Sequence, residues 1–410
     1  MNIIIINNAA KESTVLKAFL PIVYSHYEKV SVVFPSKLES ANAYNIEHNI
    51  KLCIPTLVNK IMALIYMLKL WCLKFVFQDL KLANKQNKLS IKYFVAYFRY
   101  LYSACVEYIV AEQELRNLGS ETHVFSMWYS HNALAAAMLK KQYPQIVAAS
   151  YAHSYEVDLI KNRYVGLLAD RFKEKYLDRI FFISEVVMKN YIENNREILS
   201  FTQKYKALHF GSVKKYNQMC EPSKDGAFRI LTCSGISPVK RLDILADALK
   251  IVNSPIPIIW TIFGDGSLKD KISSIVSEYD GIHVKAVMRG SVSNAEVHKY
   301  YIENPVDLFV NISSSEGLPV SIMEAMSYGV PTLATDVGGN REIVNTDTGL
   351  LIPADIQPFD VAQAITALVK AGTTQKRDAA YSMWKDSYQI NDNVLQLLSE
   401  LGSLNINRGE

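Results

Sequence analysis

The stretch VDLFVNISSSEGLPVSIMEAMSYG, from Val306 to Gly329, decides the fold because it holds a strand, a tight turn and a helix in succession. The apolar run VDLFVN is typical of a buried strand, and SSSEG is typical of a turn. PVSIMEAMSYG predicts a helix with Pro319 in its first turn and a stop at Gly329. A strand followed at once by a helix is the repeating unit of a parallel sheet.

Similar apolar runs recur along the chain, separated by helical patterns. The first half contains NIIIIN, KVSVVFP, HVFSMWY, QIVAASYA and RIFFIS. After a polar stretch from Lys214, a second series contains FRILTCS, PIIWTIFG, HVKAVM, VDLFVN and PTLAT. We therefore expect an α/β chain of two Rossmann-like, doubly wound domains that face each other across a ligand cleft. The predicted boundaries are 1–210, 211–374, and C-terminal helices in 375–410 that pack back across both domains.

Two carboxylates and a helix start define a candidate site in the opening stretch. Glu316 projects from the predicted turn and Glu324 lies inside the helix. The amides near Gly317, Leu318 and Val320 begin the helix, where unpaired donors and the helix dipole favour an anion. A diphosphate fits there, with the carboxylates accepting hydrogen bonds from sugar hydroxyls. The alternative is that both acids are ordinary solvated residues.

The segment from Asp307 to Pro353 closely resembles the Glu, seven residues, Glu motif of family-four retaining glycosyltransferases, which have the GT-B fold. Bacterial capsular, exopolysaccharide, lipopolysaccharide and O-antigen transferases are of this type. The resemblance implies that Glu324 binds the nucleotide ribose, that Glu316 lies beside the donor sugar, and that the amides after Glu316 hold the diphosphate.

The stretch TCSGISPVKRLDILADAL, from Thr232 to Leu249, resembles the family's other donor motif, in which a Lys and often an Arg neutralise the diphosphate. Lys240 matches that Lys. The Arg that many members carry a few residues earlier is absent around Gly235, so we expect Lys240 to act with Arg241 or with a residue from elsewhere. Without the surrounding motif, a helix-surface lysine would be the better interpretation.

Two loops complete the expected donor site. IFGDGSLKDKI places Gly264 and Gly266 after a predicted strand. A lone Gly-x-Gly is weak support for a dinucleotide site, but this one resembles the family's strand-to-loop turn, where glycine lets the backbone approach the ligand. Arg289, in MRGS, stands where related enzymes hold the base.

In the first domain, SYAHSYEVD places His153 at the carboxyl end of a predicted strand. It resembles an Ala-His-Gly-Tyr-Asp pattern of bacterial capsular transferases, with Ser154 and Glu156 at two of the positions. We expect His153 to contact the donor sugar, although a lone histidine is more often a packed core residue. The first turn has Asn7 and Asn8 where many relatives have a glycine pair, which leaves the acceptor contacts there open.

The positive charge of the chain is local. The net charge is +4, but residues 51–100 contain nine Lys or Arg against one acid. On one continuous helix, Lys60, Lys74, Lys81, Lys85, Lys88, Lys92 and Arg99 would share a narrow arc. A basic amphipathic helix in segment 60–99 can bind an anionic membrane, where lipid-linked acceptors sit; a solvated helix face is an equal alternative. Nucleic acid is disfavoured because the rest of the chain is not basic.

The remaining features bound the class of protein. Lys69 and Lys74 interrupt the most apolar run before it reaches the roughly 20 residues that a spanning helix needs. The opening MNIIIINN is typical of a buried strand and not of a signal peptide, and the five cysteines include no Cys-x-x-Cys pair. We expect a cytoplasmic protein, peripheral on the inner face of the cell membrane, that needs no metal and no cofactor besides its nucleotide-sugar co-substrate.

These observations favour a retaining glycosyltransferase of the hexosyltransferase type. It would move a sugar from a nucleotide sugar to a growing, lipid-linked bacterial surface glycan, with Glu316, His153 and Lys240 as catalytic residues. Two alternatives stay open: a nucleotide-sugar hydrolase or epimerase on the same fold, and a degenerate noncatalytic sugar-binding subunit.

Overall fold

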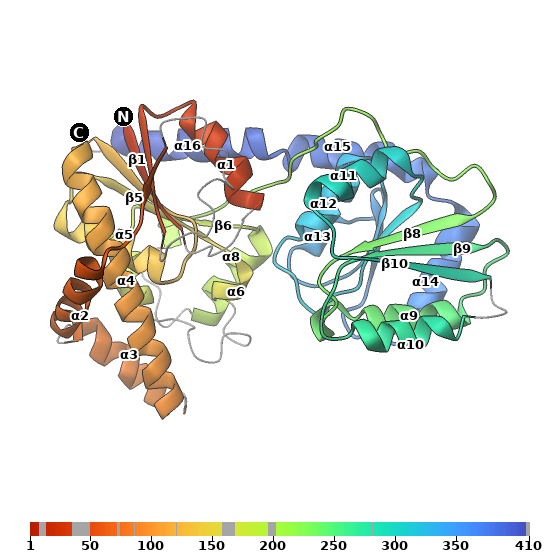
Figure 1. Cartoon of the computed structure of the whole chain (residues 1–410), viewed down its shortest axis with the longest axis horizontal. Coiled ribbons are helices and arrows are strands. Elements are labelled where there is room, and N and C mark those ends of the chain that lie inside the picture. The colour runs from red at the N-terminus through yellow and green to blue at the C-terminus, as the bar shows by residue number, and fades with distance from the viewer. Residues whose placement is uncertain are drawn as a thin grey trace. The chain divides into compact units, whose positions relative to one another are not determined.

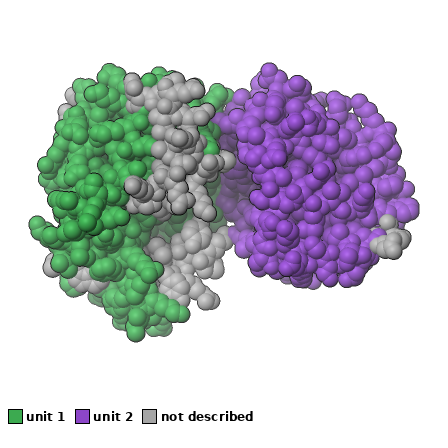
Figure 2. Space-filling view, viewed as in Figure 1, with its two compact units in different colours: residues 1–209, 391–410 green, residues 210–390 purple. Residues whose placement is uncertain are grey.

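The computed structural model describes residues 1–7, 14–34, 50–71, 74–85, 87, 89–119, 121–157, 169–195, 202–279 and 283–406. The chain divides into two compact units: residues 1–209 with 391–410, and residues 210–390 (Figure 2). Each unit contains its own parallel sheet, and we describe the two separately.

The described strands of the first unit form one parallel sheet in the order β3-β2-β1-β4-β5-β6-β7. Their bounds are β1 Asn2–Ile6, β2 Lys29–Val33, β3 Ile50–Cys53, β4 Thr122–Ser126, β5 Val147–Ala152, β6 Arg179–Phe182 and β7 Tyr205–Ala207. The four isoleucines of β1, Ile3 to Ile6, have no exposed surface because helices cover both faces of the sheet. The strand order reverses between β1 and β4, and side chains that follow these strands meet at one edge of the sheet.

The helices of the first unit are α1 Thr14–Tyr24, α2 Leu57–Trp71, α3 Lys74–Lys85, α4 Ile91–Leu118, α5 His131–Gln142, α6 Ser154–Val157, α7 Asp170–Tyr176, α8 Glu185–Asn195 and α16 Ile390–Ile406. A short 3₁₀ turn spans Thr202–Lys204. The long helix α4 begins at Ser90, whose side chain accepts a hydrogen bond from the Tyr93 amide at 3.1 Å. Helix α16 brings the C-terminal part of the chain back to this unit, where Glu400 pairs with Lys206 at 2.5 Å.

The basic segment differs from the single helical arc that its sequence predicts. It folds as three helices, α2, α3 and the start of α4, so the phase of the lysines does not run on from one helix to the next (Figure 1). Lys88 and the side chain of Lys74 lie outside the described residues. Exposed apolar side chains dominate the surface of α2: Leu57, Val58, Ile61, Met62, Leu64, Ile65 and Leu68.

The described strands of the second unit form a parallel sheet in the order β10-β9-β8-β11-β12-β13. Their bounds are β8 Phe228–Cys233, β9 Ile258–Phe263, β10 Val284–Gly290, β11 Leu308–Asn311, β12 Thr332–Thr335 and β13 Gly349–Ile352. This order is the first sheet's pattern again, with the reversal between β8 and β11.

Helices cover both faces of the second sheet: α9 Leu242–Ile251, α10 Lys269–Ser277, α11 Asn294–Glu303, α12 Val320–Ser327, α13 Asn340–Ile343, α14 Pro358–Ala371 and α15 Arg377–Ser387. Two 3₁₀ turns span Pro238–Lys240 and Thr374–Lys376. Figure 1 shows α9, α10 and α14 on one face and α11, α12 and α13 on the other. The core on the first of these faces is built around Trp260, Leu245 and Ile365, none of which has exposed surface.

The structure confirms the α/β, doubly wound architecture and every strand that the quoted apolar runs predict. Helix α12 starts after Pro319 and ends before Gly329, whose φ of +72° suits glycine. Three strands that the sequence does not predict, β3, β7 and β13, are only three or four residues long. Each forms an edge of its sheet, where short strands carry little apolar signal.

Candidate active site

Lys240 and Glu316 form an ion pair at the carboxyl ends of β8 and β11, where the order of the second sheet reverses. Nζ of Lys240 lies 2.5 Å from Oε1 of Glu316, and the Nδ2 amide of Asn311 donates to the same oxygen at 3.1 Å. Lys240 ends the 3₁₀ turn after β8, and the Val239 carbonyl accepts the Ser314 amide at 2.8 Å. The two loops are therefore fixed against each other.

Arg241 fixes the backbone that carries Glu316. Its backbone has φ +51°, and its guanidinium donates to the carbonyls of Ile312 at 2.7 Å, Ser313 at 2.7 Å and Ala354 at 2.8 Å. These bonds hold the end of β11 and the SSSEG turn that carries Glu316. The structure thus gives Arg241 three backbone partners, whereas Lys240 is the cation beside Glu316.

Glycines allow the loops of this edge to come together. A Cβ on Gly264 would lie 1.9 Å from the Ser234 carbonyl oxygen, and one on Gly266 would lie 2.4 Å from the Ile236 carbonyl oxygen. Likewise, a Cβ on Gly338, which follows β12, would lie 1.9 Å from the carbonyl oxygen of Glu316. All three glycines have positive φ, so both the space and the backbone conformation exclude a side chain.

Glu324 lies on α12 with 9% of its surface exposed, and α11 holds it in place. Its Oε1 accepts from Nδ2 of Asn294 at 2.6 Å and lies 3.6 Å from Nε2 of His298. The other ring nitrogen of His298 lies 2.9 Å from the Tyr328 hydroxyl. Oε2 has no hydrogen-bond partner within the described part of the chain. The same holds for Oε2 of Glu316, so each carboxylate keeps one oxygen for a ligand.

The remaining predicted donor residues take simpler positions. The side chain of Leu318 is buried and that of Val320 is 36% exposed, so at the start of α12 it is the amides that can serve an anion. The carbonyl of Gly317 accepts the Gly339 amide at 2.7 Å. Arg289 is exposed at the end of β10, and among the described residues it forms no hydrogen bond or ion pair with Lys240 or Glu324.

In the first unit, His153 sits in an aromatic setting at the carboxyl ends of β1, β4 and β5. Its ring packs on Trp128 with 4.3 Å between centroids, and its Nε2 lies 3.2 Å from the Met127 carbonyl. Nε1 of Trp128 donates to Oδ1 of Asn7 at 3.2 Å. Burial lowers the pKa of His153 to about 4, so its imidazole is neutral at physiological pH. Asn8 and Ala9 of the first turn lie outside the described residues.

Buried ionisable side chains lie next to this edge. Glu156 on α6 accepts the amide of His153 at 2.9 Å, and burial raises the pKa of this carboxyl group to about 8. Lys173 on α7 pairs with Asp170 at 2.6 Å and lies 3.8 Å from the centre of the Tyr129 ring. Burial also raises the pKa of Asp79 to about 7. Within the described ranges, no three acidic, His or Cys side chains form a group that could hold a metal ion.

Several of these partners were missed from the sequence. Asn311 ends the run VDLFVN and could have been noticed as a polar residue at a strand end. Asn294 and His298 could not, because nothing links α11 to Glu324 in sequence. Trp128 was inside a quoted strand run but carried no distinguishing signal, because an aromatic residue there is equally typical of a core.

Among the described residues, no helix is both long and apolar enough to cross a membrane.

Comparison with known proteins agrees with this architecture. Residues 227–371 match the family model described as glycosyl transferases group 1. The "UDP-N-acetylglucosamine--peptide N-acetylglucosaminyltransferase GtfA subunit" of Streptococcus agalactiae is 28% identical over 229 residues, 54% of this chain and 44% of that protein. The "O-antigen biosynthesis glycosyltransferase WbnH" of Escherichia coli is 30% identical over 130 residues, 32% of this chain and 35% of that protein.

The solved structure of the lipopolysaccharide outer core galactosyltransferase WaaB in its apo form superposes with a TM-score of 0.70 at 16% identity. That superposition covers 98% of this chain and 100% of the other. The two doubly wound sheets thus define the GT-B fold of glycosyltransferases. Within the second unit, the part from residue 227 to residue 371 is similar to the glycosyl transferases group 1 family. The match spans less than half the length of each of these two curated relatives.

Proposed function

We propose that the protein is a family-four retaining glycosyltransferase that moves a hexose from a nucleotide sugar to a growing, lipid-linked bacterial surface glycan. One observation carries the proposal: the Lys240–Glu316 pair stands beside the start of α12 at the reversal point of the group 1 domain. The names of the streptococcal and O-antigen relatives support a nucleotide-sugar donor and a glycan product.

The geometry supports distinct roles for the two carboxylates. A departing nucleoside diphosphate gains negative charge, which the Lys240 ammonium and the amides of Gly317, Leu318 and Val320 would stabilise without moving. Glu324, fixed by Asn294, would accept hydrogen bonds from the ribose hydroxyls through its open Oε2. Glu316 would do the same for the donor sugar, while its Oε1 holds Lys240 in place.

The first unit would supply the contact to the sugar. The neutral ring of His153 can donate or accept a hydrogen bond, according to its tautomer, without bringing a charge to the carbon where positive charge develops. The Nδ2 amide of Asn7 is buried without an acceptor among the described residues. A buried donor without an acceptor in the protein is suited to a hydrogen bond with a ligand.

Binding at a membrane surface belongs to the same proposal, since a lipid-linked acceptor lies there. Helix α2 exposes Ile61, Ile65 and Leu68 by more than half of their surface, and the segment around it carries a net charge of +8. Apolar insertion with attraction to anionic lipid would bind this face to a cytoplasmic leaflet. We expect the Ser variants at these three positions to sediment less with anionic vesicles, and the control Ile251→Ser with Phe359→Ser, exposed in the second unit, to sediment normally.

The first test is a donor screen. The purified protein is mixed with UDP-, GDP-, ADP- and CMP-sugars, and its thermal unfolding is followed. We expect sugars of one nucleotide to stabilise wild type and Glu303→Ala, whose exposed carboxylate pairs with Lys299, but not Glu324→Ala. No stabilisation by any donor would favour the noncatalytic alternative. Donor turnover without a glycan acceptor would favour the hydrolase or epimerase.

A further inference from the structure

The first unit contains a pocket of about 330 Å³ on the side of α7 that faces away from the buried charges. Its lining comes from three helices: Phe75 and Gln78 from α3, Lys141 from α5, and Arg171, Phe172, Lys175 and Tyr176 from α7. The volume falls within the range of small-ligand sites. None of the seven residues has a role in the donor site.

The helical period of α7 explains why this pocket is basic. Asp170, Lys173 and Glu174 turn inward and are at least 96% buried, and there Asp170 and Lys173 neutralise each other. Positions 171, 172, 175 and 176 form the opposite face, which contains two cations and no acid. The sequence thus separates a paired, buried face from an outer face that carries two positive charges.

The floor of the pocket is a row of aromatic rings. Phe75 and Phe172 have ring centroids 4.9 Å apart, and Phe172 and Tyr176 have centroids 4.6 Å apart. Nζ of Lys141 lies 5.6 Å from the centre of the Phe172 ring and 5.9 Å from that of Tyr176, and Nζ of Lys175 lies 5.4 Å from the latter. Both ammonium groups therefore lie near the Tyr176 ring.

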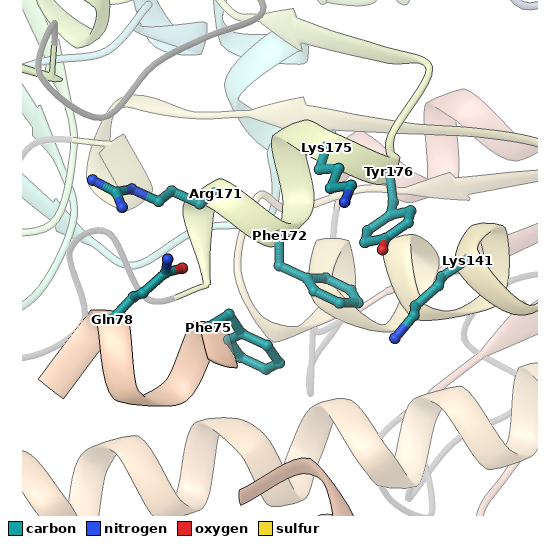
Figure 3. A pocket seen from close by; sticks show the side chains of 7 residues that line it. All are labelled: Phe75, Gln78, Lys141, Arg171, Phe172, Lys175 and Tyr176. Carbon is teal, nitrogen blue, oxygen red and sulfur yellow. The ribbon is translucent and has the colours of Figure 1, made fainter. Parts of the chain in front are cut away.

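The cations of the pocket have no acidic partner. Lys141, Arg171 and Lys175 are exposed, and no carboxylate lies within 4.0 Å of any of them in the described part of the chain. Figure 3 shows Lys141, Lys175 and Tyr176 gathered at one end, Arg171 and Gln78 at the other, and Phe75 and Phe172 between them. Like charges that have no counter-ion among the described residues favour an anion.

We infer that this pocket binds a phosphate ester. The phosphate would take charge-assisted hydrogen bonds from Lys141 and Lys175 and a neutral one from Tyr176, while the organic part covers the Phe75 and Phe172 rings. A lipid head group and a soluble phosphate ester share this chemistry. The lipid source fits the position of the pocket beside α3, in the segment of +8 net charge.

The test uses the full-length protein and isothermal titration calorimetry without any nucleotide sugar, so its outcome is independent of the transferase proposal. The probes are dihexanoyl phosphatidylglycerol, dihexanoyl phosphatidylcholine, glycerol 3-phosphate and inorganic phosphate. The variant is Lys141→Ser with Lys175→Ser. Its control is Lys370→Ser with Lys385→Ser, which removes the same charge from exposed positions of the second unit.

We expect phosphatidylglycerol to bind wild type and the control with equal affinity. Its affinity for the pocket variant should be lower by on the order of tenfold or more, because each basic residue near an anionic head group contributes to binding. Equal binding of glycerol 3-phosphate, lost in the same variant, would support the site and identify the soluble ester as its ligand. Binding that is the same for phosphatidylcholine, or that the pocket variant retains, would overturn the inference. Inorganic phosphate reports whether the ester's organic part is needed.

Discussion

The two sheets share one strand order, yet the edges at their reversal points are built from different chemistry. In the second unit, Lys240, Asn311 and Glu316 bring charge and hydrogen bonds to the edge, and glycine brings the loops close. In the first unit, Trp128 and His153 present two packed rings tilted by 35°, and burial keeps the histidine neutral at physiological pH.

This difference teaches that a doubly wound sheet fixes where a ligand can bind but not which ligand binds. The charged edge suits a group whose negative charge grows during reaction, and the aromatic edge suits an uncharged sugar. The two edges can therefore be tested for separate effects on the nucleotide and on the sugar.

The largest effect should come from the charged edge. Lys240→Ala removes the cation beside Glu316, and loss of one preorganised electrostatic contact typically lowers turnover by about 10²- to 10³-fold. The control Lys250→Ala breaks a comparable pair, 2.6 Å from Glu278, on α9 of the same unit. Initial rates with saturating donor measure the effect. If Lys240→Ala keeps wild-type turnover, the charged edge is not the site of reaction.

A second effect should follow from the close approach of loops in the second unit. Gly338→Ala would place a Cβ 1.9 Å from the Glu316 carbonyl oxygen, so the turn that carries Glu316 must shift. Gly372 also has positive φ, at +72°, but nothing lies within 4 Å of its Cβ position. Backbone strain alone costs about 1–3 kcal/mol, so Gly372→Ala should lose only that stability. Gly338→Ala should lose more, and lose turnover as well.

Thermal unfolding and donor kinetics of the two glycine variants separate these contributions. Equal losses of stability in both variants, with turnover intact, would mean that the loops are not tightly packed. The two edges would then differ in charge but not in how closely their loops pack.

How far the sequence predicts this molecule depends on whether a signal is local. The strand, turn and helix from Val306 to Gly329 are readable because apolar runs, glycine and proline act within a few residues. The pairing of Lys240 with Glu316, 76 positions apart, follows only once the sheet order is known. Asn294 beside Glu324, and Trp128 beside His153, depend on packing between elements that carry no shared pattern.

The basic segment shows the reverse case. Its lysines fit one helical arc in sequence, but α2 ends at Trp71, α3 runs from Lys74 to Lys85 and α4 begins at Ile91. Helix phase does not persist from one helix to the next. The pocket between α3, α5 and α7 could not be predicted from the sequence either. Its cations lie at positions 141 to 175, and Phe75 lies at least 66 positions earlier.

The aromatic edge should show a distinct dependence on pH. The pKa of His153 is lowered from its usual 6.5 to about 4, so the unfolded chain binds a proton between these values that the folded chain does not. This residue's contribution to stability therefore falls as the pH falls from 6.5 to 4. Glu156 acts in the opposite direction: its raised pKa of about 8 makes its contribution fall as the pH rises from 4.5 to 8.

Titration of the imidazole carbon resonances by NMR checks this prediction, with His153→Asn used to assign the signal. We expect no change of His153 between pH 8 and 5.5, and stability of the Asn variant that is less sensitive to acid than that of wild type. A midpoint near 6.5 would show a solvated ring and remove the contrast between the two edges.

The smallest expected effect tests what the aromatic edge recognises. Trp128→Phe keeps a ring against His153 but removes the N–H that donates to Asn7, a hydrogen bond that typically contributes about 1 kcal/mol. If this edge contacts the sugar, kcat/KM for the donor should fall by about fivefold, while the Kd of the free nucleoside diphosphate stays unchanged. Glu324→Ala should weaken the binding of the free nucleoside diphosphate. If Trp128→Phe also weakens the binding of the free nucleoside diphosphate, the aromatic edge does not recognise the sugar alone. Both edges would then bind the whole donor.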